Sequence, residues 1–386
     1  MKIDESVLFE LTGEKEVFNI PQKLMKMLID DSERKHLINE LEKFEHGISC
    51  SFQEFFESEI ADRKTFKQDY TPQSIGEICS NIVGTGDYLE IAAGTGSLAI
   101  NGQYKDSSKL YLTEFSEIAL PFLIINMLLR KYDAVISHED SLSGDVFATY
   151  KTTDGQLEVI DKVDDYKAQR IVMNPPYSAK WEPTEDPIFW EYGTPPKAKA
   201  DFAFILKAFD KLDDNGKMAV VLPHGVLFRG NKEQEIRQNL LDRGYISGVI
   251  GLPDKLFANT GIPVCVLVLS KQKTDSVMFI DASSEFDKIG KNNVLTDDVI
   301  TKISDTFNNK KEIERYSNLV GLDKIKDNDY NLNIPRYVDT FEPEPVIDIY
   351  QVQREIIECN AEIENTSAEL NKMFGELGLP NDFKIL

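Results

Sequence analysis

Residues 88–98 read Tyr-Leu-Glu-Ile-Ala-Ala-Gly-Thr-Gly-Ser-Leu. The apolar start is typical of a buried strand, and the two glycines allow a tight turn before a helix, where backbone N–H groups can approach a ligand. Dinucleotide enzymes, methyltransferases and plain tight turns all use Gly-x-Gly. Ala99 stands where the dinucleotide fingerprint has a third glycine, which disfavours nicotinamide binding. Glu90 lies inside the strand, where a carboxylate is costly unless a cationic or amine-bearing ligand supplies donors.

The sequence around this segment alternates strand patterns with helix patterns from residue 70 to about 271. Such alternation predicts an α/β fold with a doubly wound, mostly parallel, Rossmann-like sheet of seven strands. Only a short loop with Pro263 joins the last two strands, so we expect an antiparallel edge strand there. The strands are predicted at 88–92, 110–114, 134–138, 170–173, 217–222, 246–251 and 264–269, and the helices at 72–83, 116–130, 200–213 and 231–243.

Four parts are expected along the chain: a small helical N-terminal module at 1–66, the α/β domain at 67–275, its extension at 276–343 and a C-terminal heptad helix at 344–386. Within the α/β domain, the polar insertion 143–169 is expected to form a surface loop or a hairpin. The heptad helix either docks a partner helix or packs on the core of this chain. Its a/d positions, all apolar except Thr366, are Ile349, Val352, Ile356, Cys359, Ile363, Thr366, Leu370 and Met373.

The formal net charge of the 386-residue chain is −23. A protein that binds DNA unaided usually carries a basic footprint, because phosphate neutralisation supplies most of the non-specific affinity. If the substrate is a nucleic acid, another polypeptide must hold most of its backbone. No run of 18 apolar residues occurs, and the four cysteines are scattered without a CxxC pair. We therefore expect a cytoplasmic protein with reduced thiols, no membrane span and no metal site.

The tetrapeptide Asn174-Pro175-Pro176-Tyr177 closes the apolar run 171–173. Two prolines prevent continuation as a helix or a central strand, so a stiff turn follows the strand. The Asn174 side chain and the Pro175 carbonyl offer acceptor oxygens, and Tyr177 offers a stacking face. These groups suit a planar nitrogenous substrate with an exocyclic amine. The alternative is a turn that ends a strand, with Asn174 facing solvent.

Three further segments follow or precede predicted elements at the same edge of the sheet. Glu114 ends the second strand, about 20 residues after the glycine turn, where a ribose-binding acid is expected; it could also be a solvated acid at a helix start. Asp140, before Ser141, could accept from an adenine amine or cap a helix. The segment 70–72 enters the first helix of the domain. Together these positions predict a nucleoside cofactor beside an amine-bearing planar substrate.

These motifs together resemble an adenine-N6 DNA methyltransferase of the gamma motif order, and more narrowly the modification subunit of type I restriction–modification systems. The resemblance covers roughly residues 65–340 and a C-terminal helix. Two departures stand out: the usual Asp-Pro-Ala at the cofactor strand is Glu90-Ile91-Ala92, and the N-terminal module is shorter than is typical. The matching blocks are KQDYTP (67–72), EIAAGTGSL (90–98), LTEF (112–115), EDSL (139–142), IVMNPPYS (171–178), 200–230, 249–271 and DYNLNIPRYV (329–338).

The resemblance implies that S-adenosylmethionine donates a methyl group to the N6 amine of an adenine flipped out of DNA. Asn174, Pro175, Pro176 and Tyr177 are then catalytic, and Phe257 is a second aromatic wall for the base. It implies that Tyr70, Thr71 and Pro72 lie near the methionine end of the cofactor, Gly94 to Ser97 at the turn, Glu114 at the ribose and Asp140 at the adenine ring. The full set of cofactor-binding residues that it implies is Lys67, Gln68, Asp69, Tyr70, Thr71, Pro72, Glu90, Gly94, Thr95, Gly96, Ser97, Glu114, Asp140 and Ser141.

The expected partners are DNA and a separate specificity subunit that chooses the target sequence and docks on the C-terminal helix. A second copy of this chain and a restriction subunit are further partners that the resemblance allows. Three other functions stay open from the sequence alone: a stand-alone or phage-type adenine methyltransferase, an RNA or protein methyltransferase, and a non-catalytic assembly partner that keeps the fold.

Overall fold

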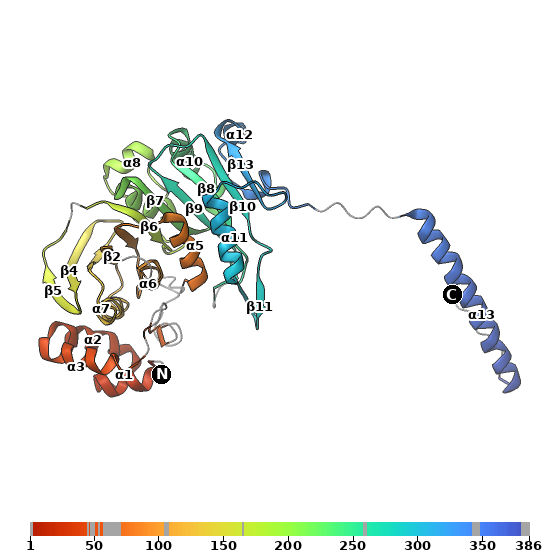
Figure 1. The fold of residues 1–386 in the computed structure, drawn as a ribbon, viewed down its shortest axis with the longest axis horizontal. Helices are drawn as coiled ribbons and strands as arrows, with labels where there is room; N and C mark the ends of the chain where they lie inside the picture. The colour runs from red at the N-terminus through yellow and green to blue at the C-terminus, as the bar shows by residue number, and fades with distance from the viewer. Residues whose placement is uncertain are drawn as a thin grey trace. The chain divides into compact units, whose positions relative to one another are not determined.

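The structure is a computed structural model of the chain. The residues that it describes form two compact units, 1–340 and 341–386. The first unit contains the sheet and the helices that cover it, and the second contains α13 (Ile349–Glu376). Figure 1 shows the elements with their labels. The described residues are 3–44, 46, 51–52, 55–56, 71–103, 108–163, 166–257, 261–341 and 348–379.

The seven strands predicted from the sequence form the middle of one sheet (Figure 1). The first five of them, from β3 to β7, are parallel, and the strand order reverses between β1 and β6. The predicted doubly wound, Rossmann-like α/β fold is therefore confirmed. In spatial order the seven are β3 (Ala134–Asp140), β2 (Leu110–Glu114), β1 (Tyr88–Ile91), β6 (Ala168–Met173), β7 (Leu212–Pro223), β9 (Val264–Ser270) and β8 (Ile246–Gly251).

The antiparallel strand β9 does not lie where the sequence predicted it. It runs antiparallel to both of its neighbours, as expected, but it lies between β7 and β8 rather than at an edge of the sheet. All seven of its residues are buried. An edge position would leave backbone N–H and C=O groups on one side of this strand unpaired, although its residues 264–269 are all apolar, so pairing on both sides is favoured.

The sheet also has more strands than the seven predicted: the described residues contribute eleven. Beside β3, an antiparallel hairpin of β4 (Asp145–Thr153) and β5 (Gln156–Ile160) forms from the polar insertion. Beside β8 lie β10 (Ser276–Asp281) and then β13 (Ser317–Gly321). The hairpin was not predicted as part of the sheet because its strands are half exposed and carry polar side chains. A separate two-stranded sheet contains β11 (Asp287–Ile289) and β12 (Asn292–Val294).

Helices cover both faces of the sheet and bury two separate cores. Successive residues of β2 illustrate the division, since Leu110 and Leu112 belong to one core and Tyr111 to the other. One face is covered by α5 (Gln73–Val83), α6 (Ser97–Gln103), α7 (Leu120–Leu129) and α11 (Asp297–Asn308), and the other by α8 (Pro187–Tyr192), α9 (Asp201–Asp210), α10 (Lys232–Asp242) and α12 (Leu322–Asp327).

The N-terminal helices α1 (Glu5–Thr12), α2 (Ile20–Ile29) and α3 (Asp31–Leu41) join the first of these cores. Both α2 and α3 contact α7. Every residue of α7 is buried, because the sheet lies on one side of it and these helices lie on another. Five apolar residues of α2 and α3 are buried there, and Phe44 is half-buried against the same core. The five are Leu24, Met27, Leu28, Leu37 and Leu41.

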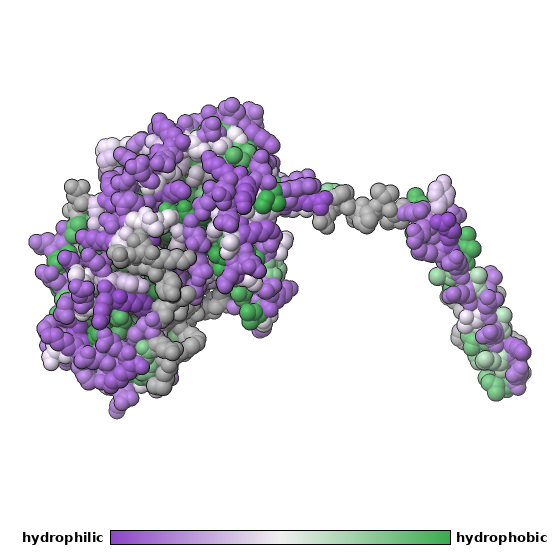
Figure 2. All heavy atoms as spheres, in the orientation of Figure 1, coloured by the Kyte–Doolittle hydropathy of each residue, from purple (hydrophilic) through white to green (hydrophobic). Residues whose placement is uncertain are grey.

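The second unit is a helix of 28 residues, α13. It begins at Asp348, whose side chain accepts hydrogen bonds from the backbone N–H groups of Tyr350 and Gln351. None of its residues is buried, and exposed apolar side chains lie along it, drawn in green among hydrophilic residues in Figure 2. Among the helices that the structure describes, α13 included, none is long and apolar enough to cross a membrane.

Phe122 of α7 is the point where the N-terminal segment meets the α/β domain. Its ring centroid lies 5.2 Å from that of Phe52, 6.1 Å from Phe55 and 5.7 Å from Phe56. We expect Phe122→Ala to lower the free energy of unfolding by about 3–5 kcal/mol in urea denaturation, because it leaves a cavity among three rings. The control Phe147→Ala, at a ring that is 57% exposed, should have a much smaller effect. A loss below about 1 kcal/mol for Phe122→Ala would contradict this packing.

Candidate functional site

A cavity of about 620 Å³ lies at the carboxyl ends of β1, β2, β3 and β6. This edge of the sheet is where parallel α/β folds place their ligands, next to the reversal of strand order. Twelve of the residues singled out from the sequence line this one cavity: Thr71, Glu90, Gly94, Thr95, Ser97, Glu114, Asp140, Ser141, Asn174, Pro175, Pro176 and Tyr177.

Other residues singled out from the sequence lie elsewhere. Pro72 precedes α5 as its N-cap, and Gly96 packs against α7, where a Cβ atom would come within 2.7 Å of Leu123 Cδ1. Phe257 is buried in the core and does not line the cavity, so the expected second aromatic wall has no support from the structure. Residues 67–70 lie outside the described residues.

The glycine turn after β1 is held by the neighbouring strand. The backbone N–H of Gly94 donates to Glu114 Oε2 at 2.6 Å, and the Asn126 side chain of α7 donates to the Thr95 carbonyl at 2.9 Å. Gly94 has a φ of +58°, with nothing near the position of a Cβ atom, so the turn stays open on the cavity side. These contacts fix the backbone that faces a ligand.

Glu114 is fixed by two backbone donors. Its other oxygen, Oε1, accepts from the Ser116 N–H at 2.7 Å, and only 6% of the residue is exposed. The pKa of Glu114 is raised above its usual value, because the effect of burial outweighs the hydrogen bonds from the backbone at Ser116, Gly94 and Phe115, which lower it. Each carboxylate oxygen has a second lone pair, so the group can still accept from ligand hydroxyls.

Glu90 lies deeper, with 2% of its surface exposed. Burial raises the pKa of Glu90 well above its usual value, a hydrogen bond from the Tyr88 hydroxyl at 3.2 Å lowers it, and the nearby Glu114 raises it further. Glu139 and Asp140 add two more carboxyl groups to the lining, and Lys180 is the lysine that the described residues contribute to it. An acidic lining of this kind suits a ligand that carries positive charge or amine donors.

Asp140 and Ser141 hold the turn after β3. Asp140 Oδ1 accepts from the backbone N–H of Leu142 at 2.9 Å and of Ser143 at 3.4 Å, so this carboxylate caps a turn rather than a helix. Ser141 Oγ lies 2.8 Å from Thr113 Oγ1 at the end of β2. The turn thus stays attached to β2, and Asp140 remains in the lining of the cavity.

Asn174 is held at the end of β6 in an unusual way. Its amide nitrogen donates to Thr71 Oγ1 at 2.9 Å, whereas its Oδ1 is buried and no donor among the described residues reaches it. A buried amide oxygen without a partner is costly, which is a reason to expect a donor from a ligand. The alternative of a solvent-facing Asn174 is therefore disfavoured. Tyr177 packs against the core and lines the same cavity.

Several lining residues had no clear signal in the sequence. Phe56 comes from the N-terminal segment, outside the motifs that were singled out, and reaches the cavity because that segment packs on Phe122. Phe115 and Ser178 end the matching blocks 112–115 and 171–178, but neither was given a role from the sequence. Phe204 lies on α9, where it reads as an ordinary apolar helix position.

The pH dependence of stability tests the buried state of Glu90. Because the pKa of Glu90 is raised in the folded state, folding favours its protonated form. The resulting stabilisation of the folded protein is complete below the pKa of Glu90 in the unfolded chain, near 4.5. It is lost as the pH rises through the folded-state pKa. We therefore expect Glu90→Gln to have a higher Tm than the wild type at pH 8, with the gap closing at about pH 4. Calorimetry across this range measures the gap.

The matched control is Glu182→Gln, which removes an exposed carboxylate that pairs with Lys197 at 2.7 Å. It should leave the shape of the Tm-against-pH curve unchanged. An identical pH dependence for Glu90→Gln and the wild type would show that Glu90 is not desolvated.

The order of the sheet and the position of the cavity define an α/β methyltransferase fold. A family model described as N-6 DNA Methylase matches residues 51–345, most of the chain, and the chain belongs to this family.

Known relatives agree with this membership. The methylase subunit of the type I restriction enzyme MpnII from Mycoplasma pneumoniae is 32% identical over 344 residues, 83% of this chain and 62% of that protein. The HindI methylase subunit from Haemophilus influenzae is 31% identical over 365 residues, 84% of this chain and 77% of that protein. The crystal structure of a type I restriction-modification methyltransferase subunit from Streptococcus thermophilus is 37% identical, with a TM-score of 0.63, and the match covers 70% of this chain and 59% of that one. The chain thus spans about three fifths of the length of two of these proteins.

Proposed function

We propose that this chain is the catalytic subunit of a type I DNA methyltransferase, which transfers a methyl group from S-adenosylmethionine to the N6 amine of an adenine flipped out of DNA. Membership of the family supports the reaction class. The observation that carries the proposal is Asn174 Oδ1, a buried acceptor at the cavity for which the described residues supply no donor. An exocyclic amine is a donor of the right kind.

The base-binding half of the cavity would be formed by the segment 174–177. Asn174 Oδ1 and the Pro175 carbonyl would accept from the two N–H groups of the amine, which draws the amine toward tetrahedral geometry and exposes its lone pair. Tyr177 would stack on the base. Removing an adenine from the duplex costs a few kcal/mol, and these contacts offset part of that cost.

The cofactor half fits S-adenosylmethionine because its lining is acidic and contains an open glycine turn. Glu114 would accept from the ribose hydroxyls, Asp140 from the adenine amine, and Glu90 lies where positive charge is favoured. Residues 67–72 and 94–97 complete the predicted set. When bound, the cofactor supplies a methyl group activated by its sulfonium.

The residues of the chain therefore have to position the amine and exclude water, and no strong general base is required. His224 supports this view, because its Nε2 lies 3.1 Å from the backbone carbonyl of Val264, in a structural contact. Its ring is thus bonded to the framework of the sheet rather than to the lining of the cavity.

Replacing Asn174 with Ala should lower kcat by about 10²–10³-fold or more, because the acceptor for the amine is lost. The Kd for S-adenosylmethionine, measured by isothermal titration, should stay nearly unchanged. Asn318→Ala is the matched control, since it removes an amide that donates to the Tyr337 carbonyl at 2.8 Å, away from the cavity. Loss of both turnover and cofactor binding in Asn174→Ala would refute the assignment to the base.

The choice of the DNA sequence is proposed to belong to another polypeptide, docked on α13. The net charge of −23 leaves this chain poorly suited to hold DNA unaided. None of the a/d positions of α13 is buried, and Ile356 is 55% and Ile363 45% exposed. Acidic residues surround this stripe, so a partner helix with basic flanking positions fits it best. The acidic residues are Asp348, Glu355, Glu358, Glu362, Glu364 and Glu369.

We expect adenine methylation of genomic DNA only when a candidate specificity polypeptide is co-expressed. The double variant Ile356→Glu/Ile363→Glu should abolish both co-purification of the partner and methylation, because it places charge in the apolar seam. Ile357→Glu is the matched control: this side chain is also exposed, at 61%, but lies off the a/d positions. Strong methylation by this chain alone would refute the division of labour, and would favour a stand-alone enzyme.

A further inference from the structure

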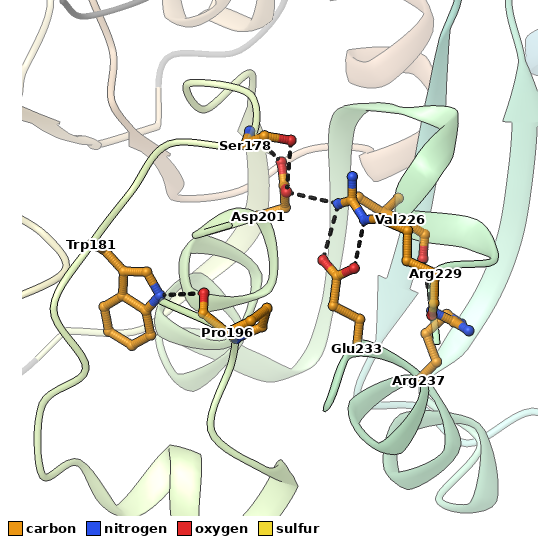
Figure 3. Close-up of polar contacts among 8 residues, drawn as sticks. All are labelled: Ser178, Trp181, Pro196, Asp201, Val226, Arg229, Glu233 and Arg237. Carbon is orange, nitrogen blue, oxygen red and sulfur yellow. Dashed lines mark hydrogen bonds and ion pairs between the residues drawn. The ribbon is translucent and has the colours of Figure 1, made fainter. Parts of the chain in front are cut away.

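A polar network starts at Ser178, the residue after Tyr177, and extends through Asp201 and Arg229 to Glu233 (Figure 3). Apart from Ser178, none of these side chains lines the cavity. The backbone N–H of Ser178 donates to Asp201 Oδ1 at 2.9 Å, and the Ser178 hydroxyl lies 3.4 Å from Asp201 Oδ2. Asp201 is the first residue of α9 and is fully buried. The start of a helix favours a carboxylate, but a group this deeply buried also needs a cation.

Arg229 is that cation. Its Nη2 donates to Asp201 Oδ2 at 2.8 Å, and the same guanidinium makes a two-pronged contact with Glu233 of α10, with Nε to Oε2 at 2.5 Å and Nη2 to Oε1 at 3.0 Å. Glu233 is 3% exposed. Burial alone would lower the pKa of Arg229, yet the pairs with Glu233 and Asp201 raise it, so the guanidinium stays charged. One arginine thus joins α9 to α10.

The loop that carries Arg229 is itself fixed. Arg237, 2% exposed on α10, donates from Nη1 to the carbonyls of Val226 at 3.1 Å and Arg229 at 2.7 Å (Figure 3). Hydrogen bonds thus connect α10 to the loop of Arg229, and Arg229 to Asp201. Asp201 is therefore held in place and can hold Ser178 in turn.

Ser178 needs stabilising contacts of this kind because its φ is +48°, in the left-handed region that residues other than glycine rarely adopt. This conformation follows immediately after Tyr177 and sets the direction in which the chain leaves the segment. At the other end, Asn174 is held by Thr71. The segment between the two anchors contains the two prolines and is stiff.

We propose that Asp201 and Arg229 are positioning residues for methyl transfer, which hold the segment 174–178 in its reactive geometry through Ser178. The inference rests on the proposed function of that segment. Neither side chain lines the cavity, so neither is expected to touch a ligand. Their effect should appear in turnover, because displacement of reacting groups by about 1 Å can cost roughly a hundredfold in rate.

The test uses Asp201→Ala in the complex with its specificity polypeptide. This variant removes the acceptor for Ser178 and still leaves Arg229 paired with Glu233, so no buried charge is left without a counter-charge. We expect kcat to fall by about a hundredfold, the KM for S-adenosylmethionine to stay within about threefold, and amide exchange in the peptide 174–180 to become about tenfold faster in hydrogen-exchange mass spectrometry. Asp201→Asn keeps one acceptor oxygen and should give intermediate values.

Two further variants separate positioning from plain stabilisation. Asp186→Ala removes a comparable pair, with Lys207 at 2.6 Å, and should lower the Tm without changing kcat. Ser178→Gly in the Asp201→Ala background should recover at least part of the lost kcat, because glycine adopts a positive φ without help.

The proposal would be overturned if Asp201→Ala changed neither kcat nor amide exchange. It would also be overturned if kcat fell only in proportion to the Tm and Ser178→Gly did not restore it. If the proposed function itself is wrong, the wild-type complex will transfer no methyl group. Amide exchange in the peptide 174–180 would in that case still support or overturn the anchoring by Asp201.

Discussion

The hydrogen bond from the Gly94 amide to the Glu114 carboxylate ties the turn after β1 to the end of β2, at a distance of 2.6 Å. It fixes a buried acid and an open backbone turn relative to each other, and both line the cavity. The close approach of this turn to α7 requires Gly96, because a Cβ atom there would meet Leu123. α7 is in turn covered by α2 and α3, so the N-terminal helices contribute to the shape of the turn through the helix between them.

Much of this arrangement could be predicted from the sequence because the signals are local. A few neighbouring residues are enough to recognise each strand end, the glycine turn, Glu114 and the segment 174–177. Parallel strands then bring their carboxyl ends to one edge of the sheet. The place of β9 could not be predicted in the same way, since its neighbours β7 and β8 are chosen by packing on both faces. Phe56 was missed for a similar reason: it reaches the cavity through a contact with Phe122.

The network around Arg229 illustrates the same limit. In the sequence, Asp201 is an acid at a helix start, Arg229 an arginine in a loop and Glu233 an acid in a helix. Each of them could equally well be an ordinary surface residue. Only the fold shows that the partly buried Arg229 pairs with the buried Asp201 and Glu233, and that Asp201 holds Ser178. The site therefore has two parts of different kinds: a ligand-facing set that motifs indicate, and a supporting set that depends on tertiary structure.

The interior position of β9 has a consequence for the synthesis of the chain. β7 ends at Pro223 and β9 begins only at Val264, with α10 and β8 between them. Until the later residues leave the ribosome, both β7 and β8 have an open, apolar edge where β9 will insert. A nascent chain that ends before β9 is thus prone to pair these edges with other strands. The central part of the sheet is complete only after β9 has been translated.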